Sequence, residues 1–191
     1  MSGSKLLRWS IGSTLIVGCV VLVLAVTLTR GVSVTANSSQ ATIVTLLPPG
    51  DAHAGELITV KLVVNNARNL AGFQSTVSFD PTQLHLTGAK VENELASSGR
   101  GIVQLGPVFR DSAVVIGAAT CPVAQCDDSR PGRIAGAIPG VDGQITLATI
   151  SFYSAAPGRY TLKLDDVRLV DTQGQRLMAG AANTVLDVSA R

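Results

Sequence analysis

Two cysteines with four residues between them are the most reactive feature of this sequence. Cys121 and Cys126 lie in the stretch TCPVAQCDD. In an oxidising compartment such a pair usually forms a disulfide that closes a small loop. A metal site that adds Asp127 and Asp128 as ligands is a second interpretation, and two free thiols are a third. The spacing favours the disulfide, because no second cluster of cysteine or histidine accompanies the pair.

The remaining polar residues do not form a catalytic pattern. No nucleophile elbow of the type Gly-x-Ser-x-Gly and no glycine-rich phosphate loop is present. His53 falls in a turn, and His85 falls at an outward position of a predicted strand. Asp165 and Asp166 are adjacent, so in a strand their side chains point to opposite faces and do not share a cleft. We therefore expect a protein that is not an enzyme and that holds no cofactor or metal.

Charge and composition exclude nucleic-acid-binding proteins as a further functional class. Lys5, Arg8 and Arg30 flank an apolar N-terminal run, and the other basic residues nearly balance the acidic ones. No basic patch with interleaved aromatic residues is present, which argues against nucleic-acid binding. Charged residues make up 15% of the chain and aromatic residues 4%, with 19 glycines. This composition, rich in Val and Thr, favours an all-β domain.

The N-terminal segment, residues 1–30, is predicted to be a signal anchor or a signal peptide. Residues 11–29 carry no charge, and a run of about 20 apolar residues can span a bilayer. The basic residues before it place the N-terminus in the cytoplasm and the rest on the extracellular side. Cleavage after Ala36 would instead release a secreted protein. Residues 31–41 are small and polar and are typical of a short tether.

Alternation of apolar and polar residues dominates the rest of the chain. Turn residues separate these segments, with a turn at 65–69, a corner at Asp80-Pro81 and a break near Asp165-Asp166. Between Leu147 and Ile150 the alternation changes phase, which a β-bulge near Ala148 or burial on both faces would explain. No long amphipathic helix follows the N-terminal run. A β-sandwich or jelly roll is therefore predicted, with strands at 42–48, 57–65, 72–79, 84–91, 113–119, 144–154, 159–171 and 183–189.

Several motifs of residues 42–189 resemble the cohesin family. They occur in the order GELITVKLVVNN, NLAGFQSTVSFDPTQLHLTG, GQITLATISFYSAAPGRYTLKLDDVRLVDTQGQRL and NTVLDVS. The resemblance implies a nine-stranded jelly roll over residues 42–191, related to carbohydrate-binding modules. It implies binding, not catalysis, with a dockerin-bearing or other surface protein as partner.

The resemblance also indicates a binding face. Gln74, Thr76 and Ser78 form the polar side of the strand that ends at the Asp-Pro corner. Dockerin-binding cohesins carry Asn and Asp at places that align with Gly72 and Gln74, so the face stays polar here but lacks the acidic contact. We predict that Gln74, Thr76 and Ser78 contact a protein partner.

Two other functions remain open from the sequence. A carbohydrate-binding module needs exposed aromatic rings on which a sugar can stack. Tyr153 and Tyr160 are the predicted platform for a polysaccharide, with Phe109 as a further candidate. A structural envelope domain without a discrete ligand would need no such surface.

Overall fold

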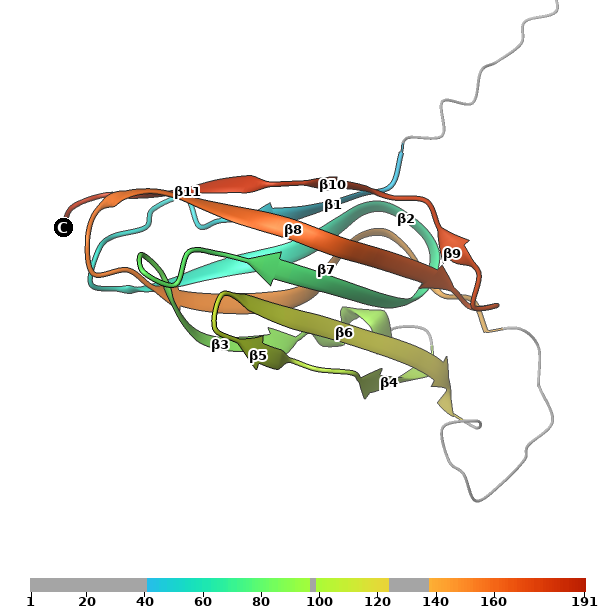
Figure 1. The fold of residues 1–191 in the computed structure, drawn as a ribbon. Helices are drawn as coiled ribbons and strands as arrows, with labels where there is room; N and C mark the ends of the chain where they lie inside the picture. Colours follow the sequence, from blue (N-terminus) through green and yellow to red (C-terminus); the bar gives the residue numbers. More distant parts are fainter. Residues whose placement is uncertain (1–40, 97–98, 124–137) are drawn as a thin grey trace, which may run out of the picture. The chain divides into compact units, whose positions relative to one another are not determined.

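The computed structural model describes residues 41–96, 99–123 and 138–191 (Figure 1). These residues form a β-sandwich with a single turn of 3-10 helix, Asn93–Ala96. No helix in these three stretches is long and apolar enough to cross a membrane. The strands are β1 (Ile43–Leu47), β2 (Leu57–Ser78), β3 (His85–Val91), β4 (Arg100–Gln104), β5 (Val108–Arg110), β6 (Ala113–Pro122), β7 (Val141–Tyr153), β8 (Gly158–Asp171), β9 (Arg176–Leu177), β10 (Gly180–Ala182) and β11 (Thr184–Val188).

The all-β sandwich predicted from the alternation is confirmed. Every predicted strand region overlaps an observed strand, and the structure adds β4, β5, β9 and β10. These additional strands have two to five residues each. Strands this short contain too few residues for a clear alternation, which explains why the sequence pattern did not indicate them.

The predicted turn at residues 65–69 is wrong, because the chain stays in one long strand there. β2 curves round at one end of the molecule and remains paired with β7 through Ala67 and Leu70 (Figure 1). Asn66 and Asn69 have φ values of 55° and 51°, a region that asparagine tolerates better than most residues. The Asn69 side chain also accepts a hydrogen bond from the Gly140 amide at 2.8 Å. The two asparagines thus bend the strand without ending it.

The bend in β2 connects the two layers of the sandwich. The first half of β2 pairs with β1 and β7, and β7 pairs with β3. The second half of β2 pairs with β8 and β6, and β6 pairs with β4 and β5. Along one side of the sandwich, β10 pairs with β1 of the first layer and β11 pairs with β8 of the second. The segment that carries β10 and β11 thus connects the two layers on this side. On the other side, among the described residues, β3 pairs only with β7 and β5 only with β6, so both layers end in free edges.

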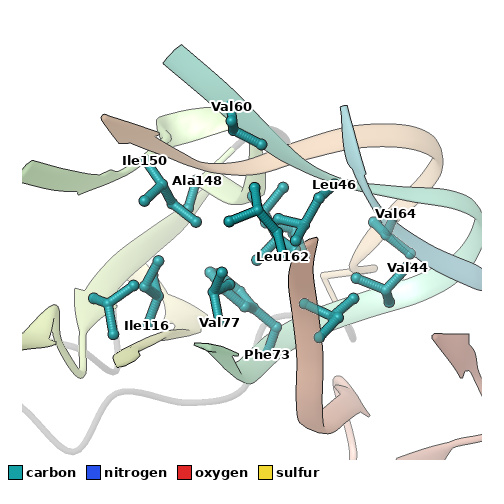
Figure 2. Packing of buried hydrophobic residues seen from close by; sticks show 14 of the residues in the cluster. Val44, Leu46, Val60, Val64, Phe73, Val77, Ile116, Ala148, Ile150 and Leu162 are labelled. Atoms are coloured by element: carbon teal, nitrogen blue, oxygen red, sulfur yellow. The ribbon is translucent and has the colours of Figure 1, made fainter. Parts of the chain in front are cut away.

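Buried aliphatic and aromatic side chains from both layers fill the sandwich. Figure 2 shows Val60 and Ile150 of the first layer facing Phe73 and Val77 of the second layer across the core. Phe152 is fully buried, and its ring meets that of Phe79 edge to face at a centroid distance of 5.3 Å. Burial of these side chains is the main force that holds the two layers together.

The phase change in β7 is a β-bulge, as one of the two predicted explanations proposed. The register of β2 against β7 shifts between the pairs Leu62–Ala148 and Val63–Thr146. The extra residue turns Leu147 to the core side, and both Leu147 and Ile150 are fully buried. The predicted break near Asp165 is also a bulge in a continuous strand, at Asp166, whose φ is 52°.

The corner after β2 is held by the carboxylate of Asp80, which predicts a pH dependence. Thr82 donates to it through its hydroxyl at 2.7 Å and its amide at 2.9 Å, and the Gln83 side chain donates at 2.7 Å. The Thr82 hydroxyl, followed by its amide, holds the pKa of Asp80 below its ordinary value. Because the pKa is lowered in the folded protein, the carboxylate stabilises the fold at pH values above the ordinary pKa. This stabilisation is lost as the pH falls through the lowered pKa.

Asp80→Asn is therefore expected to melt at a lower temperature than the unmodified protein at neutral pH. The difference should shrink as the pH falls below about 4, where the unfolded-state carboxyl of the unmodified protein becomes protonated. Thermal melting from neutral to acidic pH would measure it. A difference that stays constant with pH would show that the carboxylate does not hold the corner.

Candidate functional site

The second half of β2 presents the three predicted contact residues on one side. Gln74, Thr76 and Ser78 are partly exposed and point outward, whereas Phe73 and Val77 point into the core. This arrangement follows from the period of two in a strand. The structure thus places the three polar residues together on the outside of the second layer.

A row of charged residues on β8 lies beside them. Lys163 pairs with Ser78, and Asp165 pairs with Thr76. The Ser78 hydroxyl donates a hydrogen bond to Asp165 at 3.0 Å. Beyond the bulge, Arg168 pairs with Gln74 and forms an exposed ion pair with Asp166 at 3.0 Å. Ser78 and Asp165, and Asp166 and Arg168, are thus linked in pairs, and the charged side chains of this row are open to solvent.

On the other side of β2 the same surface is apolar. β6 places Gly117 beside Gln74 and Val115 beside Thr76. Val108 of β5 pairs with Val115 and is 52% exposed. Val103 of β4 is 48% exposed, and the nearby Leu105 is 57% exposed. Because neighbouring residues of paired strands share a face, these side chains continue the outer surface.

We call this surface the mixed face, because charged, polar and apolar rows lie side by side on it. The apolar row was not predicted from the sequence, since residues 92–112 show no regular alternation. The available signal was three large apolar residues two or three positions apart in a segment rich in glycine. The mixed face consists of Lys163, Asp165, Arg168, Gln74, Thr76, Ser78, Val115, Val103, Leu105 and Val108.

Close packing favours glycine at position 72, beside the mixed face on β2. A Cβ at this position would lie 2.9 Å from the Val170 side chain and 3.2 Å from the carbonyl oxygen of Ala118. A side chain here would therefore displace β8 or β6.

The two tyrosines of the predicted glycan platform have different environments. Tyr160 is only 7% exposed, and its hydroxyl donates to the carbonyl of Ala156 at 2.6 Å and accepts from Ser154 at 3.0 Å. Its ring is part of the core, so the prediction that Tyr160 stacks against a sugar is wrong. Tyr153 is 38% exposed and Phe109 is 54% exposed, so both rings remain accessible.

Among the residues that the structure describes, no group of three or more His, Cys, Asp or Glu residues lies close enough to hold a metal ion. The His53 ring contacts the hydroxyl of Ser189, near the C-terminus, at 2.9 Å. Cys121 is the second-to-last residue of β6. Cys126, Asp127 and Asp128 lie outside the described residues. The Cys121–Cys126 disulfide therefore stays a prediction.

No family model and no curated protein sequence matches the chain. Solved structures do match. One is the non-cellulosomal cohesin from the archaeon Archaeoglobus fulgidus, with a TM-score of 0.57, 13% identity, and coverage of 78% of this chain and 91% of that one. Another is the second type II cohesin module of the adaptor ScaA scaffoldin of Acetivibrio cellulolyticus, with a TM-score of 0.58, 18% identity, and coverage of 76% and 88%.

A third match comes from a type I cohesin–dockerin complex of Clostridium thermocellum. Its TM-score is 0.56 at 11% identity, and the alignment covers 78% of this chain and 95% of that one. At such low identity these matches concern the fold alone. The described domain has the cohesin fold, which confirms the structural part of the resemblance noted in the sequence.

Proposed function

We propose that this domain is a binding module that attaches to a partner protein through the mixed face, with a dockerin-bearing protein as the first candidate. The observation that carries the proposal is the exposure of Val103, Leu105 and Val108 beside the polar row of β2. Large apolar side chains gathered on an exposed sheet typically mark an interaction surface.

The composition of the mixed face suits protein recognition. Specific interfaces combine an apolar centre with a polar rim, and a few central residues supply most of the affinity. Here the apolar row of β4, β5 and β6 supplies the centre. The row Gln74, Thr76 and Ser78 and the charged residues of β8 supply hydrogen-bonding groups beside it.

The fold comparison supports the same kind of partner. Several of the solved cohesins that this chain resembles were determined as complexes with dockerins. The cohesin fold is thus known to present a surface to another protein. Attachment by binding, without catalysis, is the function that agrees with both the surface and the fold.

We propose further that the domain acts at the extracellular face of the membrane. Residues 11–29 are long and apolar enough to span a bilayer, and they lie outside the described residues. Alkaline extraction of membranes and protease treatment of intact cells would test this. Release of the full-length chain by alkali, or its protection from external protease, would contradict the proposal.

Capture of a partner by the full-length chain would test the binding function. The chain, purified in detergent, would be immobilised and exposed to secreted and surface proteins of the source organism. A captured protein would be identified by mass spectrometry, purified and titrated. We expect binding to be lost with Thr76→Arg, because the long cation would stand between the charged row of β8 and Val115 of the apolar row.

Thr59→Arg is the matched control. Thr59 is also a partly exposed threonine of β2, but it lies in the half that belongs to the other layer. We expect this variant to capture the same protein with unchanged affinity. Equal binding by both arginine variants, or no captured protein, would contradict a role for the mixed face.

A further inference from the structure

A hollow lies on the side of the sandwich where both layers end in free edges, and it is separate from the outer surface of the second layer. It lies between the free edges of β3 and β5 and has a volume of about 420 Å³. Ligand pockets in proteins commonly range from about 300 to 1,000 Å³. The hollow is therefore large enough for a small ligand or for one unit of a polymer.

An exposed aromatic ring forms one wall of the hollow. Phe109 pairs with Val114, which is fully buried, so Phe109 lies on the inward side of β5. Because β5 is the last strand of its layer, more than half of the Phe109 residue is nevertheless exposed. Phe79 and Leu84 also line the hollow and are buried. One wall and the floor are thus apolar.

Polar side chains surround this apolar surface. His85 and Thr87 line the hollow from β3, and Arg110 and Asp111 line it from the end of β5. Across the described ranges, neither Arg110 nor Asp111 nor His85 has a side-chain hydrogen bond or an ion pair. The rim therefore offers unused donors and an unused carboxylate acceptor close to an accessible ring.

We propose that the hollow is a carbohydrate-binding site that takes a sugar ring of a polysaccharide. The apolar face of a pyranose can stack on Phe109, while its hydroxyls act both as donors and as acceptors. The hydroxyls can accept from Arg110 and donate to Asp111, so the rim groups exchange water for sugar without losing hydrogen bonds. An apolar protein side chain would desolvate the same groups with no replacement, which is unfavourable.

The neighbouring surface of the first layer extends the site. Tyr153 pairs with His85 on one side and with Leu57 on the other. These three exposed side chains lie in register on adjacent strands, which are about 4.8 Å apart. A polysaccharide that places one ring against Phe109 can thus continue past His85 to Tyr153. The site uses none of the residues of the mixed face, so it is independent of the proposed protein binding.

Titration with defined hexasaccharides would test the proposal. The full-length chain, in a detergent without a sugar head group, would be titrated with β-1,4-linked hexamers of glucose, xylose and N-acetylglucosamine and with an α-1,4-linked glucose hexamer. We expect at least one to bind. Phe109→Ala should weaken that binding about tenfold, the upper range for loss of an aromatic contact.

One further variant and one control variant make the result decisive. Asp111→Asn should weaken binding through the rim, whereas Thr76→Arg, on the mixed face, should leave sugar binding unchanged. Circular dichroism would verify that each variant folds. Absence of binding to all four hexamers, or binding that Phe109→Ala leaves unchanged, would overturn the proposal. Loss of protein capture with Phe109→Ala, without any sugar binding, would reassign the hollow to a protein contact.

Discussion

Replacing Leu105 and Val108 together by aspartate is expected to reduce affinity for the captured partner by at least about thirtyfold. Both residues are more than half exposed, so the substitutions should leave the fold intact. Central apolar residues of an interface each contribute about 2 kcal/mol or more when they act as hot spots, which corresponds to roughly thirtyfold in affinity. Two buried carboxylates without partners would add a desolvation penalty.

The charged row should contribute much less to this affinity. Lys163→Ala removes a solvent-exposed charge beside Ser78, and such charges usually contribute less than about 1 kcal/mol. Val185→Asp on β11 is the matched control, because Val185 is a similarly exposed valine outside the mixed face. Titration of the purified partner would compare the variants. A larger effect of Lys163→Ala than of the double variant would show that charge, not apolar contact, dominates recognition.

Phe152→Ala is expected to destabilise the domain by about 3–5 kcal/mol. The Phe152 side chain is completely buried and meets the Phe79 ring edge to face, so its removal leaves a cavity between the layers. For a domain of this size the melting temperature should fall by about 10 °C or more. Denaturant titration would give the change in the free energy of unfolding.

The adjacent residue provides the control for that experiment. Tyr153 is the next position on β7 and lies on the outer surface, where truncation opens no cavity. Tyr153→Ala should therefore cost less than about 1 kcal/mol. Similar losses in the free energy of unfolding at the two positions would contradict the described packing. They would mean that β7 does not present alternate residues to the core and to solvent.

The two proposed surfaces can be separated by experiment because they use different residues. Thr76→Arg acts on the mixed face, and Phe109→Ala acts in the hollow between β3 and β5. If both surfaces are used at once, the domain would hold its partner protein next to the polysaccharide. We expect Thr76→Arg to abolish protein binding and leave sugar binding unchanged, and Phe109→Ala to weaken sugar binding and leave protein binding unchanged.

The sequence alone determined the properties that depend on neighbouring residues. Alternation with a period of two predicted the β-sandwich and the outward position of Gln74, Thr76 and Ser78. The Asp80-Pro81 pair predicted the corner after β2, and the phase change near Leu147 indicated either a bulge in β7 or burial on both faces, of which the structure shows the bulge. Such features follow from local backbone geometry, which each short segment carries in itself.

Only the tertiary structure decided which segments lie side by side. Val103, Leu105 and Val108 become one row because β4 and β5 both pair with β6, which no local pattern reveals. Phe109 is exposed because β5 is the last strand of its layer. Tyr160 is buried although tyrosine is often exposed, because the carbonyl of Ala156 and the hydroxyl of Ser154 satisfy its hydroxyl. Exposure depends on contacts between residues far apart in the chain, and alternation within a strand does not contain that information.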